Sequence, residues 1–211
     1  MPAILLTEAA RENLLMVFEA AKEEGALGPS PVDEHLKHAL AWAEILPEPK
    51  RFVDLGSGGG VPGLILAMLF PESEAVLIDA RRRRSANLEI SVHTLGLTER
   101  VTVLCARAEE AGRDPELRGG FDLVVARSFG SPAITAECAA PFLSVGGSLS
   151  VSEPPSASDD RWQEEGLNAL GLAKPELHRI GEAGFMVSRL ETLCPERYPR
   201  RNGMPEKRPL W

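Results

Sequence analysis

The sequence predicts an α/β protein built on a mostly parallel sheet of seven strands. Short apolar segments rich in β-branched residues recur from residue 51 onward, and helical patterns separate them. Parallel neighbours need such crossovers, so this alternation is typical of a doubly covered sheet. With 211 residues, the chain is long enough to bury a core. The strands are expected at 51–55, 76–79, 101–105, 121–126, 148–152, 177–180 and 185–192.

We expect three parts along the chain. Residues 1–48 form a helical cover, in which Thr7 caps a helix reaching Gly25 and Ser30 caps a second helix that continues past His38 to Ile45. Residues 49–194 form a Rossmann-like domain, and residues 195–211 form a basic arm rich in proline and arginine that packs on it. Further helices are expected at 85–95, 133–143 and 162–172.

Composition restricts the function classes. The net charge of −8 argues against indiscriminate coating of nucleic acid. The longest apolar runs fall short of the roughly 18 residues that a membrane helix needs, and the N-terminus lacks a signal-peptide pattern. Cys105, Cys138 and Cys194 are odd in number and lack metal-type spacing, which predicts free thiols in a reducing cytoplasm. We therefore expect a cytoplasmic protein without a membrane anchor.

Two histidines invite a metal interpretation. His35 and His38 lie three residues apart, on one face of a predicted helix. No cysteine or further histidine lies nearby to complete a site. We therefore expect packing or capping histidines, and no metal.

The strongest motif is Asp54-Leu-Gly-Ser-Gly-Gly-Gly-Val-Pro-Gly63, a glycine loop between a buried strand and a helix. No Gly-Lys-Ser/Thr follows, which excludes a Walker phosphate loop. Asp79 ends the next strand, 25 residues after Asp54, where a carboxylate can accept hydrogen bonds from ribose hydroxyls. The leading Asp54 indicates S-adenosylmethionine rather than NAD. The predicted cofactor residues on this loop are Asp54, Gly56, Ser57, Gly58 and Val61.

Other candidates follow later strands, because ligands sit beyond the carboxyl ends of a parallel sheet. They are Asp79, Ala108, Glu109, Arg127 and the loop after Ser152. Asp79 has the alternative of capping the next helix, and Glu109 that of a solvated helix start. For Arg127, a ligand carboxylate or an RNA phosphate competes with a salt bridge to Asp79 or Glu109.

These motifs resemble the bacterial small-subunit ribosomal RNA guanine-N7 methyltransferases (RsmG, also called GidB). The resemblance covers about residues 37–210. Besides the glycine loop it rests on Leu77-Ile-Asp79, Arg107-Ala-Glu109, Val125-Ala-Arg127 and Tyr198-Pro-Arg-Arg-Asn-Gly-Met-Pro-Glu-Lys-Arg-Pro-Leu210.

The resemblance implies a class I methyltransferase fold and S-adenosylmethionine as cofactor. It further implies methylation of N7 of a guanine in the 530 loop of 16S RNA, free or in an assembling small subunit. Carried over residue by residue, it places cofactor contacts on Gly56, Val61, Ala108, Glu109 and Arg127, and makes Asp79 the acid that binds the ribose.

Apart from the absence of the family's amino-terminal Asn-Leu-Thr segment, two segments depart from the family pattern. Lys37-His-Ala-Leu-Ala-Trp-Ala43 keeps His38 but lacks the family's acid and serine. Ser152-Glu153-Pro154 stands where the family has Lys-Gly, so an acid replaces a cation. Both departures fall on the substrate side. A different RNA, a small-molecule substrate, or a non-catalytic S-adenosylmethionine-binding module therefore remain alternatives.

The chemistry asks little of the protein. Guanine N7 carries a lone pair and no proton, so the reaction needs alignment and no general base. Arg127 and His38 are candidate positioning residues. After the fourth strand, Arg127-Ser-Phe-Gly130 replaces the Asn/Asp-Pro-Pro-Tyr that methylation of an exocyclic amine needs, and no cysteine nucleophile follows.

Two basic segments are candidate RNA contacts. Arg81 to Arg84 supply four positive charges, and residues 196–211 carry five basic against two acidic side chains. The alternatives are a solvated charge run and a loose tail. The predicted RNA-binding residues are Arg81, Arg84, Arg200, Arg201 and Lys207.

Overall fold

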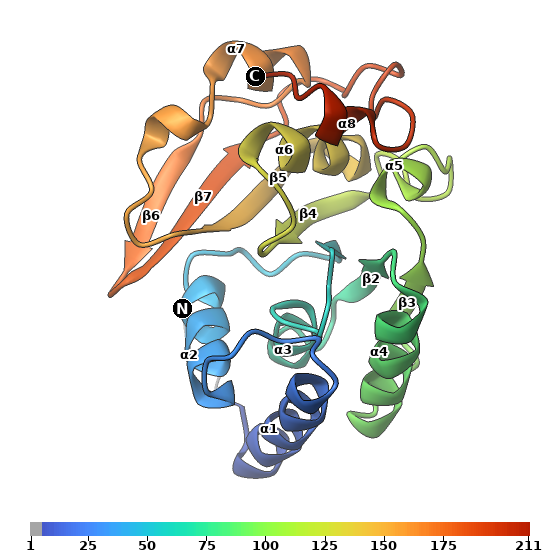
Figure 1. The fold of residues 1–211 in the computed structure, drawn as a ribbon, viewed down its shortest axis with the longest axis vertical. Helices are drawn as coiled ribbons and strands as arrows, with labels where there is room; N and C mark the ends of the chain where they lie inside the picture. Colours follow the sequence, from blue (N-terminus) through green and yellow to red (C-terminus); the bar gives the residue numbers. More distant parts are fainter. Residues whose placement is uncertain (1–5) are drawn as a thin grey trace.

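The computed structural model describes residues 6–211, without the side chain of Asp159, and contains a seven-stranded sheet (Figure 1). The strand order is β3-β2-β1-β4-β5-β7-β6. Strands β1 to β5 pair in parallel, and β7 runs antiparallel between β5 and β6. This confirms the predicted mostly parallel sheet. The strands are β1 (Arg51–Leu55), β2 (Glu74–Asp79), β3 (Val101–Cys105), β4 (Phe121–Ala126), β5 (Leu143–Glu153), β6 (Glu176–Ile180) and β7 (Ala183–Arg189).

Helices cover both faces of the sheet and create two hydrophobic cores (Figure 1). One core includes Phe18 and Trp42 from the N-terminal helices, and the other includes Phe142 and Leu167. Within residues 6–211, no helix has the length and apolar character to cross a membrane. The first face carries α1 (Glu8–Glu23), α2 (Val32–Ala43), α3 (Gly63–Leu69) and α4 (Arg82–Thr94), and the second carries α5 (Ala108–Ala111), α6 (Pro132–Ala139), α7 (Glu164–Ala169) and α8 (Met204–Lys207).

The N-terminal helices have different starts. The Thr7 hydroxyl accepts the Ala10 N–H at 3.2 Å, which confirms the predicted cap of α1. The predicted cap of α2 at Ser30 is wrong, because Pro31 occupies the N-cap with extended backbone and without a side-chain hydrogen bond. Asp33 and Glu34 in the first turn interact favourably with the helix dipole instead. The helix ends at Ala43, before the predicted Ile45.

The largest boundary error concerns β5. The glycine pair Gly146-Gly147 suggests a loop, but the strand already begins at Leu143 and runs through it. Gly146 adopts a φ of +91°, and the pairing with β4 shifts register between Phe121 and Leu123. The glycines therefore form an irregularity inside the ladder. Helix 133–143 is likewise shorter than predicted, since a 3₁₀ turn at Ala140–Phe142 follows α6.

Two C-terminal elements are also shorter than predicted. Helix α7 occupies only the middle of the predicted range 162–172, because the N–H groups of Leu170 and Leu172, beyond its end, both donate to the Leu167 carbonyl and close a turn. Strand β7 ends at Arg189 rather than at residue 192. Thr192 instead donates its N–H to the Gly171 carbonyl at 3.3 Å, which takes this segment out of the ladder.

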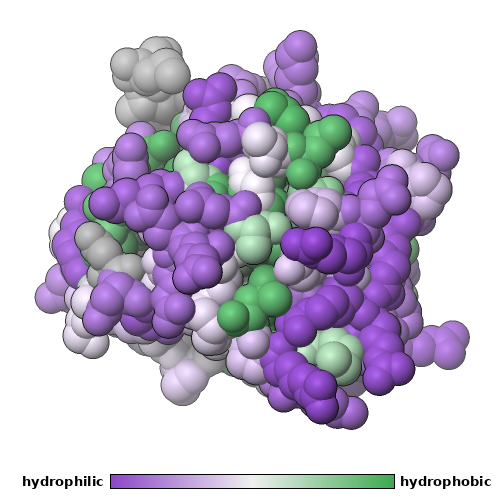
Figure 2. All heavy atoms as spheres, turned by 90° about the horizontal axis from the view of Figure 1, so that it is seen from above, coloured by the Kyte–Doolittle hydropathy of each residue, from purple (hydrophilic) through white to green (hydrophobic). Residues whose placement is uncertain are grey.

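The C-terminal arm packs on the second face of the sheet. The Arg118 guanidinium donates to the backbone carbonyls of Cys194, Pro195 and Tyr198, at 2.8–3.1 Å. Figure 2 looks down on this side of the molecule and shows a mainly hydrophilic surface crossed by a narrow apolar strip. The division of the chain at residues 48 and 194 stays a prediction, since all parts share the two cores.

Candidate active site

The glycine loop is fixed by hydrogen bonds to the neighbouring strand. The N–H groups of Gly56 and Ser57 donate to the Ile78 carbonyl, at 2.8 and 3.0 Å. The Gly58 N–H donates to Asp79 Oδ2 at 3.0 Å. Gly56 and Gly58 have φ angles of +75° and +55°, which favour glycine. The structure thus brings the predicted cofactor residues of the loop next to Asp79.

Other segments of the protein pack closely against the glycines of this loop. A Cβ on Gly56 would lie 2.7 Å from Phe129, and one on Gly59 would lie 2.6 Å from Leu27. A Cβ on Gly58 would lie 3.3 Å from the Ala26 carbonyl oxygen. The sequence attributes these glycines to ligand approach. The structure shows that the α1–α2 connection and Phe129 already require small residues here.

Asp79 holds two backbone amides and keeps acceptor capacity. Besides Gly58, the Arg81 N–H donates to its Oδ1 at 2.8 Å, at the start of α4. Arg84 lies 3.8 Å from Oδ2. A carboxylate offers about four acceptor sites, so each oxygen can accept one more hydrogen bond. The helix-start alternative and the ribose prediction are therefore compatible.

Asp54 is a buried acid with one unsatisfied oxygen. Its Oδ2 accepts the Gly63 N–H at 2.9 Å, at the start of α3. Its Oδ1 is buried and has no hydrogen-bond partner. Burial raises the pKa of this carboxyl to about 7, against the effect of the Gly63 amide. Such a group would accept a cation or a further donor readily.

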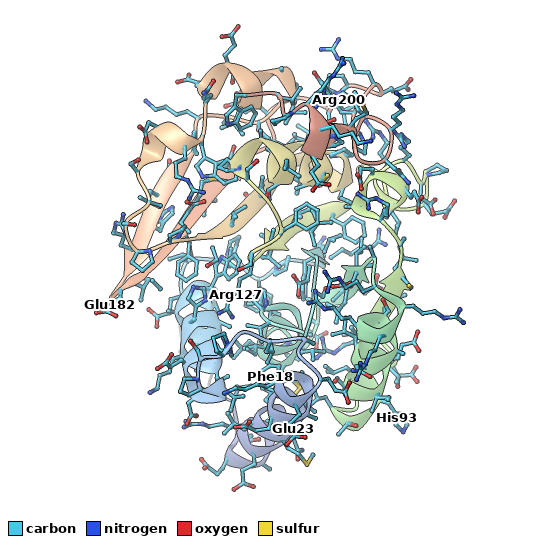
Figure 3. The ribbon with its side chains drawn as sticks, viewed as in Figure 1. Phe18, Glu23, His93, Arg127, Glu182 and Arg200 are labelled. Carbon is cyan, nitrogen blue, oxygen red and sulfur yellow. The ribbon has the colours of Figure 1, made fainter. Side chains whose placement is uncertain are left out.

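Arg127 follows β4 and faces α2 (Figure 3). Its Nη2 lies 2.8 Å from Nδ1 of His35. A guanidinium only donates, so His35 is the neutral acceptor in this pair. Burial lowers the pKa of Arg127, while the charge of Asp54 raises it. Among the described side chains, Arg127 forms neither of the alternative salt bridges, to Asp79 or to Glu109. The arginine beside Asp79 is Arg84, and Glu109 pairs with Arg107.

His38 lies on the same helical face, one turn after His35. Its Nε2 is 3.0 Å from the Ser152 hydroxyl, and its ring packs edge-on against Phe185. Burial and the nearby Arg127 charge lower the pKa of His38 to about 4. It is therefore neutral near pH 7. Both histidines thus make contacts within the fold, as expected of packing residues.

A cavity of about 320 Å³ opens at the ends of β4 and β5. It adjoins the glycine loop, because Phe129 lines the cavity and also packs on Gly56. Glu153 belongs to the predicted loop after Ser152, whereas Arg161 and Trp162 contribute to the cavity but were not predicted as site residues. Arg161 and Trp162 lie in a region without a motif, beyond a proline-rich loop. The lining comprises His38, Arg127, Ser128, Phe129, Gly130, Pro132, Val151, Ser152, Glu153, Pro154, Arg161 and Trp162.

Ala108 and Glu109 begin the short helix α5 after β3. Glu109 Oε1 accepts from Arg107 Nη2 at 3.0 Å and from the Gly203 N–H at 2.8 Å. Burial alone would raise the pKa of Glu109, but these donors outweigh it and lower the pKa. The solvated alternative is therefore wrong for Glu109. Its carboxylate anchors the C-terminal arm beside the predicted cofactor contacts.

The predicted RNA contacts divide into exposed and engaged cations. Arg81, Arg201 and Lys207 are exposed. Arg84 is turned toward Asp79, and Arg200 forms an ion pair with Glu137 at 2.6 Å. Arg200 therefore anchors the arm on α6, as Figure 3 shows beside α8. An RNA contact from Arg200 stays a prediction, although its Nε and Nη2 already donate within the chain.

Val61 lies between the loop and α3 with its side chain in the first core. A cofactor contact from Val61 stays a prediction. The three cysteines are free thiols, as expected, with Cys138 and Cys194 buried and Cys105 exposed.

Comparison with known proteins identifies relatives over most of the chain. Residues 28–165 match the family described as GidB: rRNA small subunit methyltransferase G. Ribosomal RNA small subunit methyltransferase G of Synechococcus sp. (strain RCC307) is 35% identical over 170 residues, covering 77% of this chain and 72% of the relative. The protein of the same name from Streptococcus pyogenes serotype M12 (strain MGAS9429) is 36% identical over 206 residues, covering 94% of this chain and 85% of the relative.

Solved structures support the fold. The O-methyltransferase from Bacillus cereus in complex with SAH aligns with a TM-score of 0.61 and 13% identity, over 85% of this chain and 91% of that one. The T. thermophilus 16S rRNA methyltransferase RsmC, in complex with AdoMet and guanosine, aligns with a TM-score of 0.54 and 22% identity, over 75% of this chain and 39% of that one. At these identities the likeness concerns the fold alone, which is that of class I methyltransferases.

Proposed function

Because the chain belongs to the ribosomal RNA small subunit methyltransferase G family, we propose that it methylates N7 of a guanine in the 530 loop of 16S ribosomal RNA. Family and fold make the protein an S-adenosylmethionine-dependent methyltransferase. The target atom, the target loop and the contact residues are the proposal.

The residues around the glycine loop suit S-adenosylmethionine. The unsatisfied Asp54 Oδ1 attracts a cation or a hydrogen-bond donor, and the nearby Arg127 guanidinium attracts an anion. They match the ammonium and the carboxylate at the amino-acid end of this cofactor. Asp79 retains acceptor sites for ribose hydroxyls. When bound, the cofactor supplies a methyl group activated by a sulfonium.

The observation that carries the proposal is the cavity beside this loop. Besides two arginines, its ionisable lining residues are His38, whose pKa is about 4, and Glu153, which pairs with Arg161. Transfer to guanine N7 needs no base, because the nitrogen attacks with its lone pair and no proton leaves. The protein's contribution is then to orient the base and exclude water.

The exposed cations suit the RNA backbone. Arg81 precedes α4 beside Asp79, and Arg201 and Lys207 lie in the arm that Glu109 anchors. Phosphate contacts of this kind position an RNA without reading its sequence. They also make binding depend on salt.

The first test measures binding and transfer together. Calorimetry measures the affinity of the wild type, Asp79→Ala and the exposed control Asp33→Ala for S-adenosylmethionine. Only Asp79→Ala should lose affinity, by about 10- to 100-fold, because one or two charge-assisted hydrogen bonds to the cofactor disappear. Thermal unfolding of each variant reports whether the loop still folds.

Transfer is then followed from methyl-labelled cofactor to unmethylated 16S RNA, both free and in small subunits. Cleavage of the RNA chain at 7-methylguanine after reduction and aniline treatment locates the product. Methylation in the 530 loop supports the proposal. If the protein binds the cofactor but transfers no methyl group to either form of RNA, the proposed RNA substrate is wrong. If the protein does not bind the cofactor, the proposed cofactor site is wrong.

A further inference from the structure

Resting on this proposed function, we propose that Glu153 reads the Watson–Crick edge of the target guanine in the cavity. The residue would then determine base specificity. It departs from the Lys-Gly of the family pattern and plays no part in the cofactor site described above. The juxtaposition of Glu153, Arg161 and Trp162 at the cavity wall carries this inference.

The cavity has the character of a nucleobase pocket. Its volume of about 320 Å³ lies at the lower end of the range for small-ligand pockets. Phe129 and Trp162 supply aromatic surface, and Pro132 and Pro154 add apolar walls. Enzymes that modify a base inside folded RNA or DNA extrude it into such a pocket and read its edge there.

Glu153 is the carboxylate among the residues that line this cavity, and its orientation is fixed. Its side chain is only 4% exposed. Trp162 Nε1 donates to Oε1 at 3.0 Å, and Arg161 Nη1 donates to Oε2. Each oxygen can accept two hydrogen bonds, so each retains one acceptor site. Arg161 also balances the charge of the carboxylate.

Guanine has the complementary donors. Its N1–H and its N2 amino group lie side by side on the Watson–Crick edge, at a spacing that suits the two oxygens of a carboxylate. Adenine presents an acceptor, N1, at the same place. Its lone pair would face a lone pair of the Glu153 carboxylate, and the two acceptors would repel each other. Inosine lacks the N2 amino group and would form one hydrogen bond instead of two. Discrimination therefore follows from donor pattern.

The sheet order places the two edges of the base correctly. Strand β4 lies between β1, which leads into the glycine loop, and β5, which ends at Glu153. A base above β4 with its N1–H and N2 amino group toward Glu153 has its five-membered ring, which carries N7, toward β1. The cofactor site lies on that side. The same contact that selects guanine would thus orient N7 for methylation.

The test compares three nucleotides on the intact protein. Binding of guanosine, inosine and adenosine 5′-monophosphate is measured by saturation-transfer NMR in the presence of S-adenosylhomocysteine. The wild type should bind the inosine nucleotide about 10-fold and the adenosine nucleotide about 100-fold more weakly than the guanosine nucleotide. Glu153→Gln should bind all three within about 3-fold, because an amide offers one acceptor and one donor.

Glu164→Gln is the matched control, since Glu164 is an exposed carboxylate at the start of α7 and does not line the cavity. It should keep the wild-type preference. Equal binding, or no measurable binding, of the nucleotides to the wild type would overturn the assignment, whether or not Glu153→Gln folds. So would an unchanged preference in Glu153→Gln.

Methyl transfer to 16S RNA, measured in parallel, separates the two hypotheses. A preserved guanine preference without transfer to RNA would contradict the proposed reaction and leave Glu153 as a base-reading residue. Transfer at the wild-type rate by Glu153→Gln would overturn the role of Glu153 and leave the proposed reaction intact.

Discussion

Four buried acids, two on each half of the sheet, differ in their main hydrogen-bond donors. On the β1–β2 side, Asp54 and Asp79 accept hydrogen bonds from backbone amides, those of Gly63 and Gly58. On the β4–β5 side, Glu137 and Glu153 accept from arginine side chains. All four carboxylates are nearly inaccessible to solvent. Only the partners differ.

This difference has a functional consequence. Backbone partners are independent of side-chain identity, so the cofactor half keeps one geometry as long as the glycine loop keeps its path. Arginine partners can be exchanged by substitution, so the other half is free to change its recognition surface. The departures from the family pattern, at the His38 helix and at Glu153, lie on the arginine-partnered side.

The strongest way to break this contrast is to remove an arginine partner. Arg200→Ala leaves Glu137, which is 0% exposed, without its ion pair. Removing one member of a buried pair typically costs about 3–5 kcal/mol, because the remaining charge stays desolvated. Urea unfolding should show this loss, whereas the exposed Arg201→Ala should change the free energy of unfolding by less than about 0.5 kcal/mol. Equal stability of the two variants would contradict the anchoring role of Arg200.

A second prediction sharpens the contrast through pH. Burial raises the pKa of Asp54 to about 7 in the folded protein, from 3.8 in the unfolded chain. Between these values the unfolded chain releases the proton first, so this group lowers stability as the pH rises through the window, and the loss is complete above the folded pKa. Asp54→Asn keeps an acceptor for the Gly63 N–H and does not titrate.

The stability difference between Asp54→Asn and the wild type should therefore grow in favour of the variant from pH 5 to pH 8, measured by thermal unfolding without cofactor. The same variant should bind S-adenosylmethionine more weakly, because it loses the charge that we propose to face the ammonium. Parallel stability profiles for the two proteins would show that Asp54 ionises normally in the folded state.

The smallest expected effect concerns the exposed cations. Arg201→Ala and Lys207→Ala should each weaken RNA binding and lower the slope of log affinity against log salt by about 0.7. Cofactor affinity should stay the same, since neither side chain is in the site. Filter binding at several salt concentrations measures the slope. An unchanged slope in both variants would remove the arm from the RNA interface.

The sequence by itself determined the sheet, the glycine loop and the placement of Asp54 and Asp79 toward the carboxyl ends of neighbouring strands. These features depend on local patterns: strand periodicity, glycines at positive φ, and acids at strand ends. Each signal lies within a few residues of the structure that it specifies, and the resemblance to a family rests on the same stretches. Even the misplaced start of β5 arose locally, because Gly146-Gly147 has the composition of a loop and forms an irregularity in the ladder.

Only the tertiary structure decided the partners of the arginines and the histidines. Arg200 meets Glu137 across 63 residues, Arg127 meets His35 across 92, and Arg161 shares Glu153 with Trp162 in a segment without any motif. A guanidinium in a sequence is equally suited to a phosphate, a ligand or a carboxylate of the same chain. Which of these it binds depends on distances that arise only when both faces of the sheet are packed.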